Sequence, residues 1–437
     1  MNWGGLDRPG GSRPKESQAT GRSASANHLA EAVYPILTAI LVLLAATFYL
    51  VGQELVASGF QEYHPRLSWK AVTGPAVSGS PTAGPPPAGP PPAEPPPAGL
   101  TAGLAEQPGK VILSFTGDVL LGGLVRWAVH QSGADYPWAQ VAPKLRVTDL
   151  TVVNLESPVS NRGTPQPGKE FTFEGEAGSL AGAARAGIDL VNLANNHTLD
   201  YGPEALLDTL EELKKNGIRW VGAGRSAAEA AAPAFFQVNG LRLAFLGFTD
   251  VVPASVGWPW TAGENYPGVA TTRDETAMLA AVREAKGSAD AVIVLVHWGV
   301  EGSRQPESAQ RRLAQKLVEA GATVIIGHHP HVLQGFQFAL DRFVAWSLGN
   351  FIFDVGGAMS SETSVLELEV GPRGVVERAL VTPARIYGVQ PRLLSGRSAR
   401  DALETMNGLS AEFWTAVDAD GAVRRAPPKA QVTPPPR

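Results

Sequence analysis

Residues 190 to 202 read LVNLANNHTLDYG, where an apolar run that ends at Leu193 is followed at once by polar side chains. Short apolar runs bounded by polar and turn residues are typical of buried strands. In α/β sheets, ligands gather beyond the carboxyl ends of the strands, because the loops there carry polar groups on a rigid base. The stretch therefore predicts an α/β protein with a functional site at one sheet edge, and its own candidates are Asn195, Asn196, His197 and Asp200.

The same pattern recurs between Gly109 and Gln390. Two helix-like stretches, GPEALLDTLEELKKNG and SAQRRLAQKLVEAG, alternate there with short β-rich apolar runs: KVILSFTGD, LTVVNLESP, IDLVNLANNH, LRLAFLGFTD, DAVIVLVHWG, TVIIGHHPH and RFVAWSLGN. Alternation of short strands with helices predicts the α/β class. We therefore predict one globular domain over residues 109–390, followed over residues 391–437 by a C-terminal extension and a Pro-rich disordered tail.

Most of these runs end in Asp, Glu, Asn or His, and five of the eight histidines in the chain stand at such ends. Carboxylate, amide and imidazole groups together suit manganese, iron or zinc, whereas calcium and magnesium prefer oxygen ligands. The chain contains no cysteine, so thiolate ligands are excluded. The candidate ligands for one or two divalent ions are Asp118, Glu156, Asn196, His297, His329 and His331.

Two features of these candidates bear on mechanism. The HPH sequence at 329 to 331 places alternate side chains on the same side of an extended backbone, so both histidines are expected to reach neighbouring metal positions. His197 is the natural general acid to protonate a leaving group, and Asp200 would hold its ring. Asp200 is equally suited to cap the helix that begins near GPEALL, and the sequence leaves both roles open.

Further polar residues near these strand ends are candidates for binding substrate or for orienting a metal ligand. Lys169 and Arg126 would bind an anion or remain solvated, and Ser347 and Asn350 would orient a ligand or shape a turn. Trp258 and Trp260 lie in a Gly- and Pro-rich loop that would cover the site or pack on its surface. The complete set is Asn154, Asn195, Lys169, Arg126, His328, Glu301, Ser347 and Asn350.

Residues 32–53, AVYPILTAILVLLAATFYLVGQ, carry no charge over about the 20 residues that a transmembrane helix requires. A cleaved signal peptide is the alternative, but its apolar region would be about 7 to 15 residues long. Arg8, Arg13, Lys15 and Arg22 precede the segment, which favours a cytoplasmic N-terminal segment over residues 1–31. The prediction is a single-pass protein of the cell membrane whose main domain is extracytoplasmic.

Residues 54–108 form a Pro-rich extracytoplasmic linker in this interpretation. Its stretch GPPPAGPPPAEPPPAG, residues 84 to 99, predicts extended polyproline II, which would hold the domain away from the bilayer. A ligand for an SH3-like domain is the alternative. The formal net charge of −5 gives no broad basic surface, so nucleic acid is not an expected partner. No nucleotide-binding or serine-hydrolase motif occurs in the sequence.

The motifs TGDVLLGG, NLESPVS, LANNHTLDYG, VHWGVEG, GHHPHVLQG and SLGNFIFD, spread over residues 110 to 355, resemble the CapA family. These capsule-biosynthesis and poly-γ-glutamate synthesis proteins are similar to calcineurin-like metallophosphoesterases. The resemblance implies a four-layer α/β/β/α sandwich of the metallophosphatase-like type. It also implies an outward-facing, membrane-tethered protein that handles an anionic γ-glutamyl polymer beside other membrane proteins of polymer synthesis, with ATP used by a separate ligase.

The chain departs from the wider metallophosphoesterases at several positions. They begin with Asp-x-His, whereas Val119 and Leu120 follow Asp118 here, so one expected metal ligand is missing. Asn154-Leu155-Glu156 stands where a second Gly-Asp is expected. In CapA-like proteins the HWG motif continues with Glu-Tyr, but Glu301 is followed here by Gly302, which removes an aromatic side chain.

Three functions follow from these patterns. The first is a metal-dependent component of poly-γ-glutamate or capsule assembly or export. The second is a free-standing metal-dependent hydrolase of phosphoesters or γ-glutamyl amides, similar to a metallophosphoesterase, with His197 as the acid. The third is a noncatalytic scaffold that binds the polymer without metal.

Overall fold

The computed structural model describes residues 109–254, 257–339, 341–355 and 361–427. The predicted cytoplasmic segment, transmembrane helix and linker, and the last residues of the predicted tail, lie outside these ranges. Within the described ranges, no helix has both the length and the apolar character that crossing a membrane requires.

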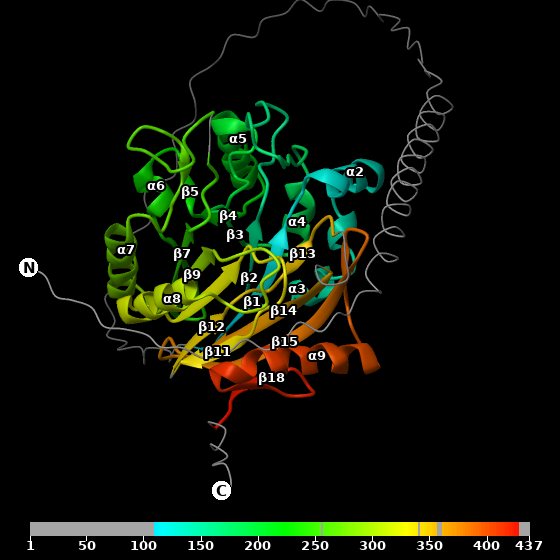
Figure 1. The fold of residues 1–437 in the computed structure, drawn as a ribbon, viewed down its shortest axis with the longest axis vertical. Helices are drawn as coiled ribbons and strands as arrows, with labels where there is room; N and C mark the ends of the chain where they lie inside the picture. The colour runs from blue at the N-terminus through cyan, green and yellow to red at the C-terminus, as the bar shows by residue number, and fades with distance from the viewer. Residues whose placement is uncertain (1–108, 255–256, 340, 356–360, 428–437) are drawn as a thin grey trace, which may run out of the picture. The chain divides into compact units, whose positions relative to one another are not determined.

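A ten-stranded sheet forms one half of the described structure (Figure 1). The order along it is β17-β18-β15-β14-β1-β2-β3-β4, with β13 beside β1 and β16 beside β15. The strands β13, β1, β2, β3 and β4 run parallel, so the carboxyl ends of β1, β2 and β3 meet at one edge. The strands are β1 (Val111–Val119), β2 (Leu150–Leu155), β3 (Leu190–Asn192), β4 (Arg219–Val221), β13 (Asn350–Ile352), β14 (Glu362–Val370), β15 (Val376–Tyr387), β16 (Gln390–Leu393), β17 (Thr415–Val417) and β18 (Ala422–Arg425).

A six-stranded sheet forms the other half, in the order β11-β12-β10-β9-β7-β6. Its central strands β12, β10, β9 and β7 are parallel, which brings the ends of β9 and β10 to one edge. A small two-stranded sheet pairs β5 with β8. These strands are β5 (Ala223–Gly224), β6 (Ala234–Val238), β7 (Leu241–Thr249), β8 (Gly268–Val269), β9 (Ala291–His297), β10 (Val324–His328), β11 (Phe336–Ala339) and β12 (Arg342–Ala345).

The two sheets share one hydrophobic core. Phe115 of β1 and Phe245 of β7 are fully buried in it, together with Ile293 and Leu295 of β9. The intervening β9 residues point to a separate core on the other face of the six-stranded sheet, because side chains alternate along a strand. Burial on both faces explains why these parallel strands read as continuous apolar runs in the sequence.

Helices cover the outer faces of both sheets. Residues of α2, α3, α4 and α5 pack with the outer face of the ten-stranded sheet, and residues of α7 and α8 pack with that of the six-stranded sheet (Figure 1). The mixed α/β class predicted from the sequence is thereby confirmed. The helices are α2 (Gly123–Ser132), η1 (Tyr136–Trp138), α3 (Ala142–Leu145), α4 (Leu180–Ala186), α5 (Gly202–Lys215), α6 (Ala227–Ala231), α7 (Glu275–Ser288), α8 (Ser308–Ala320), α9 (Gly396–Ser410) and η2 (Ala411–Phe413).

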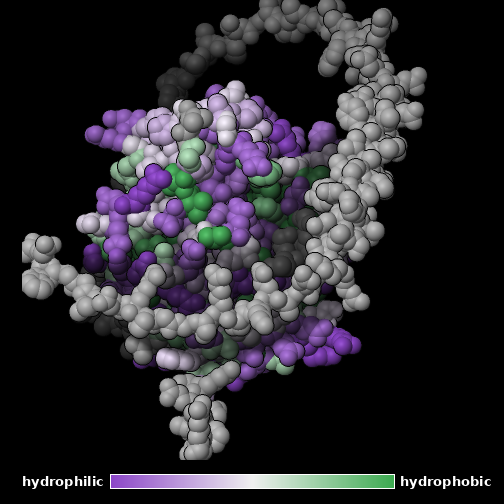
Figure 2. All heavy atoms as spheres, in the orientation of Figure 1, coloured by the Kyte–Doolittle hydropathy of each residue, from purple (hydrophilic) through white to green (hydrophobic). Residues whose placement is uncertain are grey.

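The C-terminal extension is part of this architecture. β18 pairs with β15, and β17 pairs with β18, so the ten-stranded sheet continues well past residue 390. Leu403 and Met406 of α9 are buried in the core between the sheets. Figure 2 shows that hydrophilic residues cover most of the visible surface of the described part, with apolar residues in small groups between them.

Candidate metal centre

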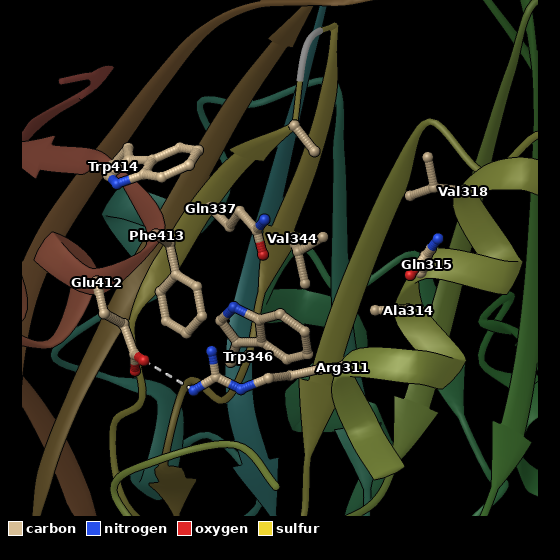
Figure 3. A pocket seen from close by; sticks show the side chains of 11 residues that line it. Arg311, Ala314, Gln315, Val318, Gln337, Val344, Trp346, Glu412, Phe413 and Trp414 are labelled. Atoms are coloured by element: carbon tan, nitrogen blue, oxygen red, sulfur yellow. Dashed lines mark hydrogen bonds and ion pairs between the residues drawn. The ribbon is translucent and has the colours of Figure 1, made fainter. Parts of the chain in front are cut away.

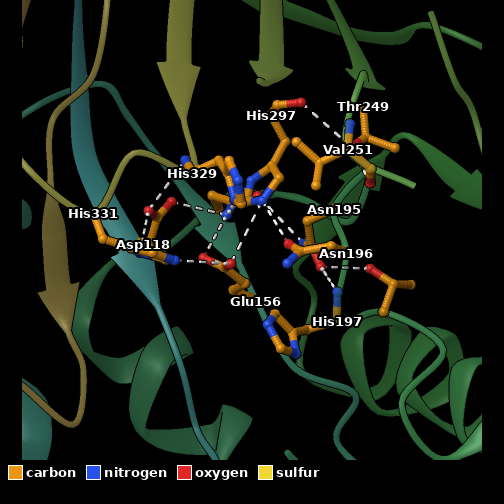
Figure 4. Close-up of polar contacts among 12 residues, drawn as sticks. Asp118, Glu156, Asn195, Asn196, His197, Thr249, Val251, His297, His329 and His331 are labelled. Atoms are coloured by element: carbon orange, nitrogen blue, oxygen red, sulfur yellow. Dashed lines mark hydrogen bonds and ion pairs between the residues drawn. The ribbon is translucent and has the colours of Figure 1, made fainter. Parts of the chain in front are cut away.

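The carboxyl ends of the parallel strands place polar side chains from both sheets in one group (Figure 4). In the ten-stranded sheet, Asp118 of β1 lies in register with Asn154 of β2. In the six-stranded sheet, His297 of β9 lies in register with His328 of β10. The strand-end rule thus explains how residues far apart in the sequence become neighbours.

Two groups of potential ligands share the Glu156 carboxylate. In the first, Oδ2 of Asp118 lies 3.2 Å from Nδ1 of His331, and Oε1 of Glu156 lies 3.6 Å from Nε2 of the same ring. In the second, Oε1 of Glu156 lies 3.5 Å from Nε2 of His297, and His329 completes the group. The potential ligand atoms of each group lie within 4.8 Å of one another.

Asn196 completes this arrangement, because its Oδ1 lies 2.7 Å from Nε2 of His297. A third group joins His329 and His331 to the exposed carboxylate of Glu301. The structure therefore brings all six residues that were predicted as metal ligands to one place, and adds a carboxylate at its rim.

Burial gives these side chains unusual proton affinities. Burial and the neighbouring Asp118 carboxylate raise the pKa of Glu156 well above its ordinary value. Burial favours the neutral ring of His331, but the carboxylates of Glu156 and Asp118 outweigh it and raise its pKa to about 10. Burial and the nearby His331 lower the pKa of His329 to about 3. One histidine with a lowered pKa and one with a raised pKa thus flank the buried Glu156 carboxylate.

The hydrogen bonding of this cluster fits a divalent cation. Oε1 of Glu156 and Nδ1 of His329 are buried and have no hydrogen-bond partner among the described residues. Buried polar atoms are almost always paired, so each orphan needs an explanation such as an ion. Manganese, iron and zinc accept the oxygen and nitrogen donors present here. The residues therefore fit a metal site, and Glu156 would contribute to it as the member common to two of the groups.

His329 and His331 reach the cluster by a route that differs from the extended backbone assumed from the sequence. Their φ angles are 94° and 57°, in the left-handed region that non-glycine residues rarely adopt. The chain turns sharply after β10, and this turn directs both rings into the cluster. Such backbone strain is typical of functional sites, where the surrounding structure enforces it.

His197 stands beside the cluster in a chain of polar contacts. Its Nδ1 lies 2.7 Å from Oδ2 of Asp200. Nζ of Lys169 donates to the same carboxylate and, at 2.5 Å, to the carbonyl oxygen of Asn196. Asp200 does not cap the following helix, whose N-cap residue is Tyr201. Of the two roles that the sequence left open, Asp200 has the one that orients His197.

Lys169 is largely buried at the edge of the site. Its side chain is only 13% exposed, and its ammonium group is committed to Asp200. Burial lowers its pKa, although the Asp200 carboxylate opposes the shift. Nζ also lies 5.1 Å from the ring centroid of Trp260. Lys169 therefore belongs to the support of His197.

A pocket of about 460 Å³ opens over the cluster. His197, His329 and His331 line it, so three ring edges are accessible from this space. Its other walls are largely apolar and were not anticipated from the sequence, although Phe353 lies in the quoted SLGNFIFD motif. The remaining lining residues are Lys169, Glu170, Phe171, Phe173, Asn196, Val251, Val252, Pro253, Glu301 and Phe353.

Two phenylalanines provide aromatic side chains beside the pocket histidines, although Gly302 stands where CapA-like proteins have a tyrosine after the HWG motif. The ring of Phe173 lies 5.0 Å from that of His197, and the ring of Phe353 lies 4.9 Å from that of His331, between centroids. Each ring limits the positions that its histidine partner can adopt. The aromatic environment of the pocket thus comes from segments other than the HWG motif.

Several predicted residues orient the cluster. Nδ2 of Asn154 donates to Oδ1 of Asp118 at 2.9 Å, which holds that carboxylate in place. Oδ1 of Asn350 lies 2.8 Å from Nδ1 of His331. Oδ1 of Asn195 accepts a hydrogen bond from the backbone N–H of His197 at 3.0 Å. These contacts act on the candidate ligands and on His197.

Other predicted residues lie at the margin. Nε2 of His328 lies 3.2 Å from the carbonyl oxygen of Thr116, and Oγ of Ser347 donates to the Val332 carbonyl at 2.8 Å. Both therefore shape the backbone near the site. Arg126 pairs with Glu174 at 2.6 Å and is not among the described residues that line the pocket.

The two tryptophans of the Gly- and Pro-rich loop are tied to the segment that carries His197. Nε1 of Trp260 donates to the Asn195 carbonyl at 3.0 Å, and Nε1 of Trp258 donates to the Leu199 carbonyl at 2.9 Å. Trp260 is almost fully buried. This part of the loop packs against the segment instead of covering the pocket.

The fold and site define an α/β protein with a candidate metal centre at the ends of its strands. Residues 112–355 match the family model described as bacterial capsule synthesis protein PGA_cap, and the chain belongs to this family. It is 36% identical to the PGA biosynthesis protein CapA of Bacillus subtilis (strain 168) over 299 residues, which are 66% of this chain and 77% of that protein.

It is also 33% identical to the capsule biosynthesis protein CapA of Bacillus anthracis, over 61% of this chain and 65% of that protein. Among solved structures, the 5'-nucleotidase precursor of Thermus thermophilus matches 68% of this chain and 58% of its own, with 15% identity and a TM-score of 0.38. That score is too low to establish a common fold.

Proposed function

We propose that this chain is a membrane-anchored, outward-facing component of poly-γ-glutamate or capsule assembly or export, and that it works with a divalent metal. Two relatives that carry poly-γ-glutamate or capsule biosynthesis in their names support the process. The observation that carries the metal dependence is the buried Oε1 of Glu156, which has no hydrogen-bond partner among the described residues and belongs to a carboxylate that two groups of potential ligands share. One or two ions of manganese, iron or zinc would be held there.

The proposed chemistry at this site is hydrolysis of a γ-glutamyl amide or a phosphoester. A divalent ion held by the cluster would supply Lewis-acid polarisation of the carbonyl or phosphoryl oxygen. Nδ1 of His197 faces Oδ2 of Asp200, so Nε2 is the nitrogen that would take up a proton, and the resulting imidazolium would deliver that proton to a leaving group. Burial lowers the pKa of this ring, although the Asp200 carboxylate opposes the shift. Lys169 and Asp200 keep the ring in this orientation. A free-standing hydrolase of the same bonds is the second candidate, favoured by the position of His197 in the pocket wall.

The membrane arrangement in this proposal rests on the sequence. Residues 1–31 would lie in the cytoplasm, residues 32–53 would span the cell membrane, and residues 54–108 would carry the domain outward. Because the sequence has no phosphate-binding loop, a separate ligase would supply the ATP-dependent step, and an anionic γ-glutamyl polymer would be the substrate. Protease added outside intact cells should digest the domain and spare residues 1–31.

Metal analysis of the purified full chain tests the proposed centre directly. We expect near-stoichiometric manganese, iron or zinc in the wild type, and its loss in the double variant His329→Ala/His331→Ala. His130→Ala is the matched control, because that histidine is exposed and belongs to none of the potential ligand groups among the described residues. No bound metal in the wild type after supplementation, or equal metal in the double variant, would refute the metal centre.

A further inference from the structure

A second pocket, of about 440 Å³, lies on the outer side of the six-stranded sheet, between α8 and η2 (Figure 3). Its floor and one wall are aromatic, formed by Trp346, Phe413 and Trp414. The rings of Trp346 and Phe413 lie 5.4 Å apart between centroids. Phe413 and Trp414 follow residue 355, where the family match ends, so this pocket depends on the C-terminal extension.

Polar groups are distributed around these rings. The guanidinium of Arg311 lies over Phe413, 4.8 Å from its ring centroid, and pairs with Glu412 at 2.9 Å. Nε1 of Trp346 is buried and has no hydrogen-bond partner among the described residues. Figure 3 shows this nitrogen on the side of the ring toward Phe413 and Gln337.

Trp414 is the most unusual residue of the pocket. It is 63% exposed, and its φ angle of 49° places a bulky side chain in the left-handed region. This conformation is costly for residues other than glycine, and such outliers motivate a search for function. Large exposed aromatic side chains are also enriched at binding sites, because they bury much area with little loss of side-chain freedom. The pocket thus has an exposed aromatic surface that a bound segment could bury.

The course of the chain after β18 indicates which segment could occupy the aromatic pocket. Thr415 of β17 pairs with Arg425 of β18 in an antiparallel ladder, and the N–H of Ala426 donates to the Trp414 carbonyl at 2.8 Å. The described chain therefore ends, at residue 427, next in sequence to a residue that is hydrogen-bonded to Trp414, which lines the pocket. The sequence from that point reads PPKAQVTPPPR, residues 427 to 437.

Aromatic grooves with an indole donor are the usual receptors for polyproline II segments, whose preformed backbone loses little entropy on binding. Eleven residues in this conformation would extend about 34 Å, enough to cross the pocket. Ala430 and Val432 are the only non-proline apolar residues of the segment, too few to form a core of its own, so a docked state would depend on aromatic surface from the domain. We propose that residues 427–437 dock in this pocket as a polyproline II segment over Trp346, Phe413 and Trp414.

Tryptic cleavage after Lys429 tests this proposal in the full chain, with the rate measured by mass spectrometry. Docking protects the bond in proportion to the docked population when opening is fast. We expect cleavage about tenfold faster in Trp414→Ala than in the wild type. The tether gives the segment an effective concentration of millimolar order, so even a weak site would be mostly occupied in the wild type. Trp127→Ala is the control, because Trp127 is 64% exposed on α2 and should leave the rate unchanged. Equal rates in all three proteins would overturn the proposal.

A variant of the segment separates docking from damage to the pocket. Replacing Pro434, Pro435 and Pro436 by alanine leaves the domain intact and should also accelerate cleavage after Lys429. If only Trp414→Ala accelerates it, the prolines are not recognised and the proposal fails. A synthetic peptide of residues 84 to 99 provides the last comparison. Displacement of the tail by an equimolar amount of that peptide would assign the pocket to the linker, whereas an unchanged rate supports the C-terminal segment.

Discussion

The metal pocket and the aromatic pocket are built on opposite principles. The first collects polar side chains from the ends of two sheets, and its key atoms are buried, charged and closely coupled. The second collects rings and long side chains from α8, β11, β12 and the C-terminal extension. The metal pocket lies within the region that matches the family, and the aromatic pocket uses residues beyond it. The two pockets therefore differ in which part of the chain builds them: the first lies wholly within the matched region, and the second also needs residues that follow it.

The strongest test of the contrast is Glu156→Gln. We expect metal affinity to fall by more than the roughly 10- to 100-fold that follows loss of a residue supporting a ligand, because both ligand groups share this carboxylate. The metal-free variant should be more stable than the metal-free wild type, since a buried ionisable group without a hydrogen-bond partner at Oε1 is removed. Metal titration and thermal unfolding measure the two effects. Undiminished metal affinity would show that Glu156 does not join the groups.

Lys169→Ala tests the support of His197. The substitution leaves the buried Asp200 carboxylate without its cationic partner, and we expect a loss of roughly 1.5–3 kcal/mol in the free energy of unfolding. Arg126→Ala is the matched control at a pair whose arginine is 40% exposed, where roughly 0–1 kcal/mol is expected because of solvent screening. Denaturant unfolding compares them. Equal losses would mean that Lys169 is not a buried partner.

The pH dependence of metal binding distinguishes the polar cluster from the aromatic pocket. In the metal-free protein, Glu156, whose pKa is raised well above its ordinary value, and His331, with a pKa of about 10, favour their protonated forms. A metal requires deprotonated ligands, so it displaces these protons and its affinity rises with pH. The expected gain is about tenfold per pH unit for each proton released, and it ends once both groups have lost their protons.

Calorimetry in buffers of different ionisation enthalpy counts the released protons. Metal affinity that does not change with pH would contradict the assignment of His331 as a ligand. Docking of the C-terminal segment involves aromatic stacking and backbone hydrogen bonds, so protection of the bond after Lys429 should vary little over the same pH range. That comparison is made in the full chain with a protease active across the range.

The smallest expected effect concerns Trp414→Gly in a chain that ends at Pro427. Glycine adopts the observed φ of 49° without a steric cost, so the free energy of unfolding should stay unchanged or rise by up to about 1 kcal/mol. In the full chain the same substitution should abolish protection after Lys429. A large loss of stability in the shortened chain would show that Trp414 supports the domain itself, which would remove the contrast between the two pockets.

Much of the metal pocket follows from the sequence. Parallel strands in the right order must bring their carboxyl ends to one edge, so Asp118, Asn154 and His297 could be placed in one site from their positions after apolar runs. The α/β class follows from the same alternation. The family motifs lie at these strand ends, which is why the resemblance and the strand-end rule select the same residues.

Tertiary structure decided what local patterns do not encode. Lys169 is buried against Asp200 because two segments 31 residues apart meet, and no spacing rule predicts that contact. The left-handed turns at His329 and His331 are enforced by their surroundings, since neither residue type selects that conformation. Likewise, β18 joins the sheet through pairing with β15, and β17 through pairing with β18, which makes the short C-terminal strands part of the domain. The sequence by itself determined the chemistry available at the strand ends, and long-range packing decided which groups are buried, paired or left open to a ligand.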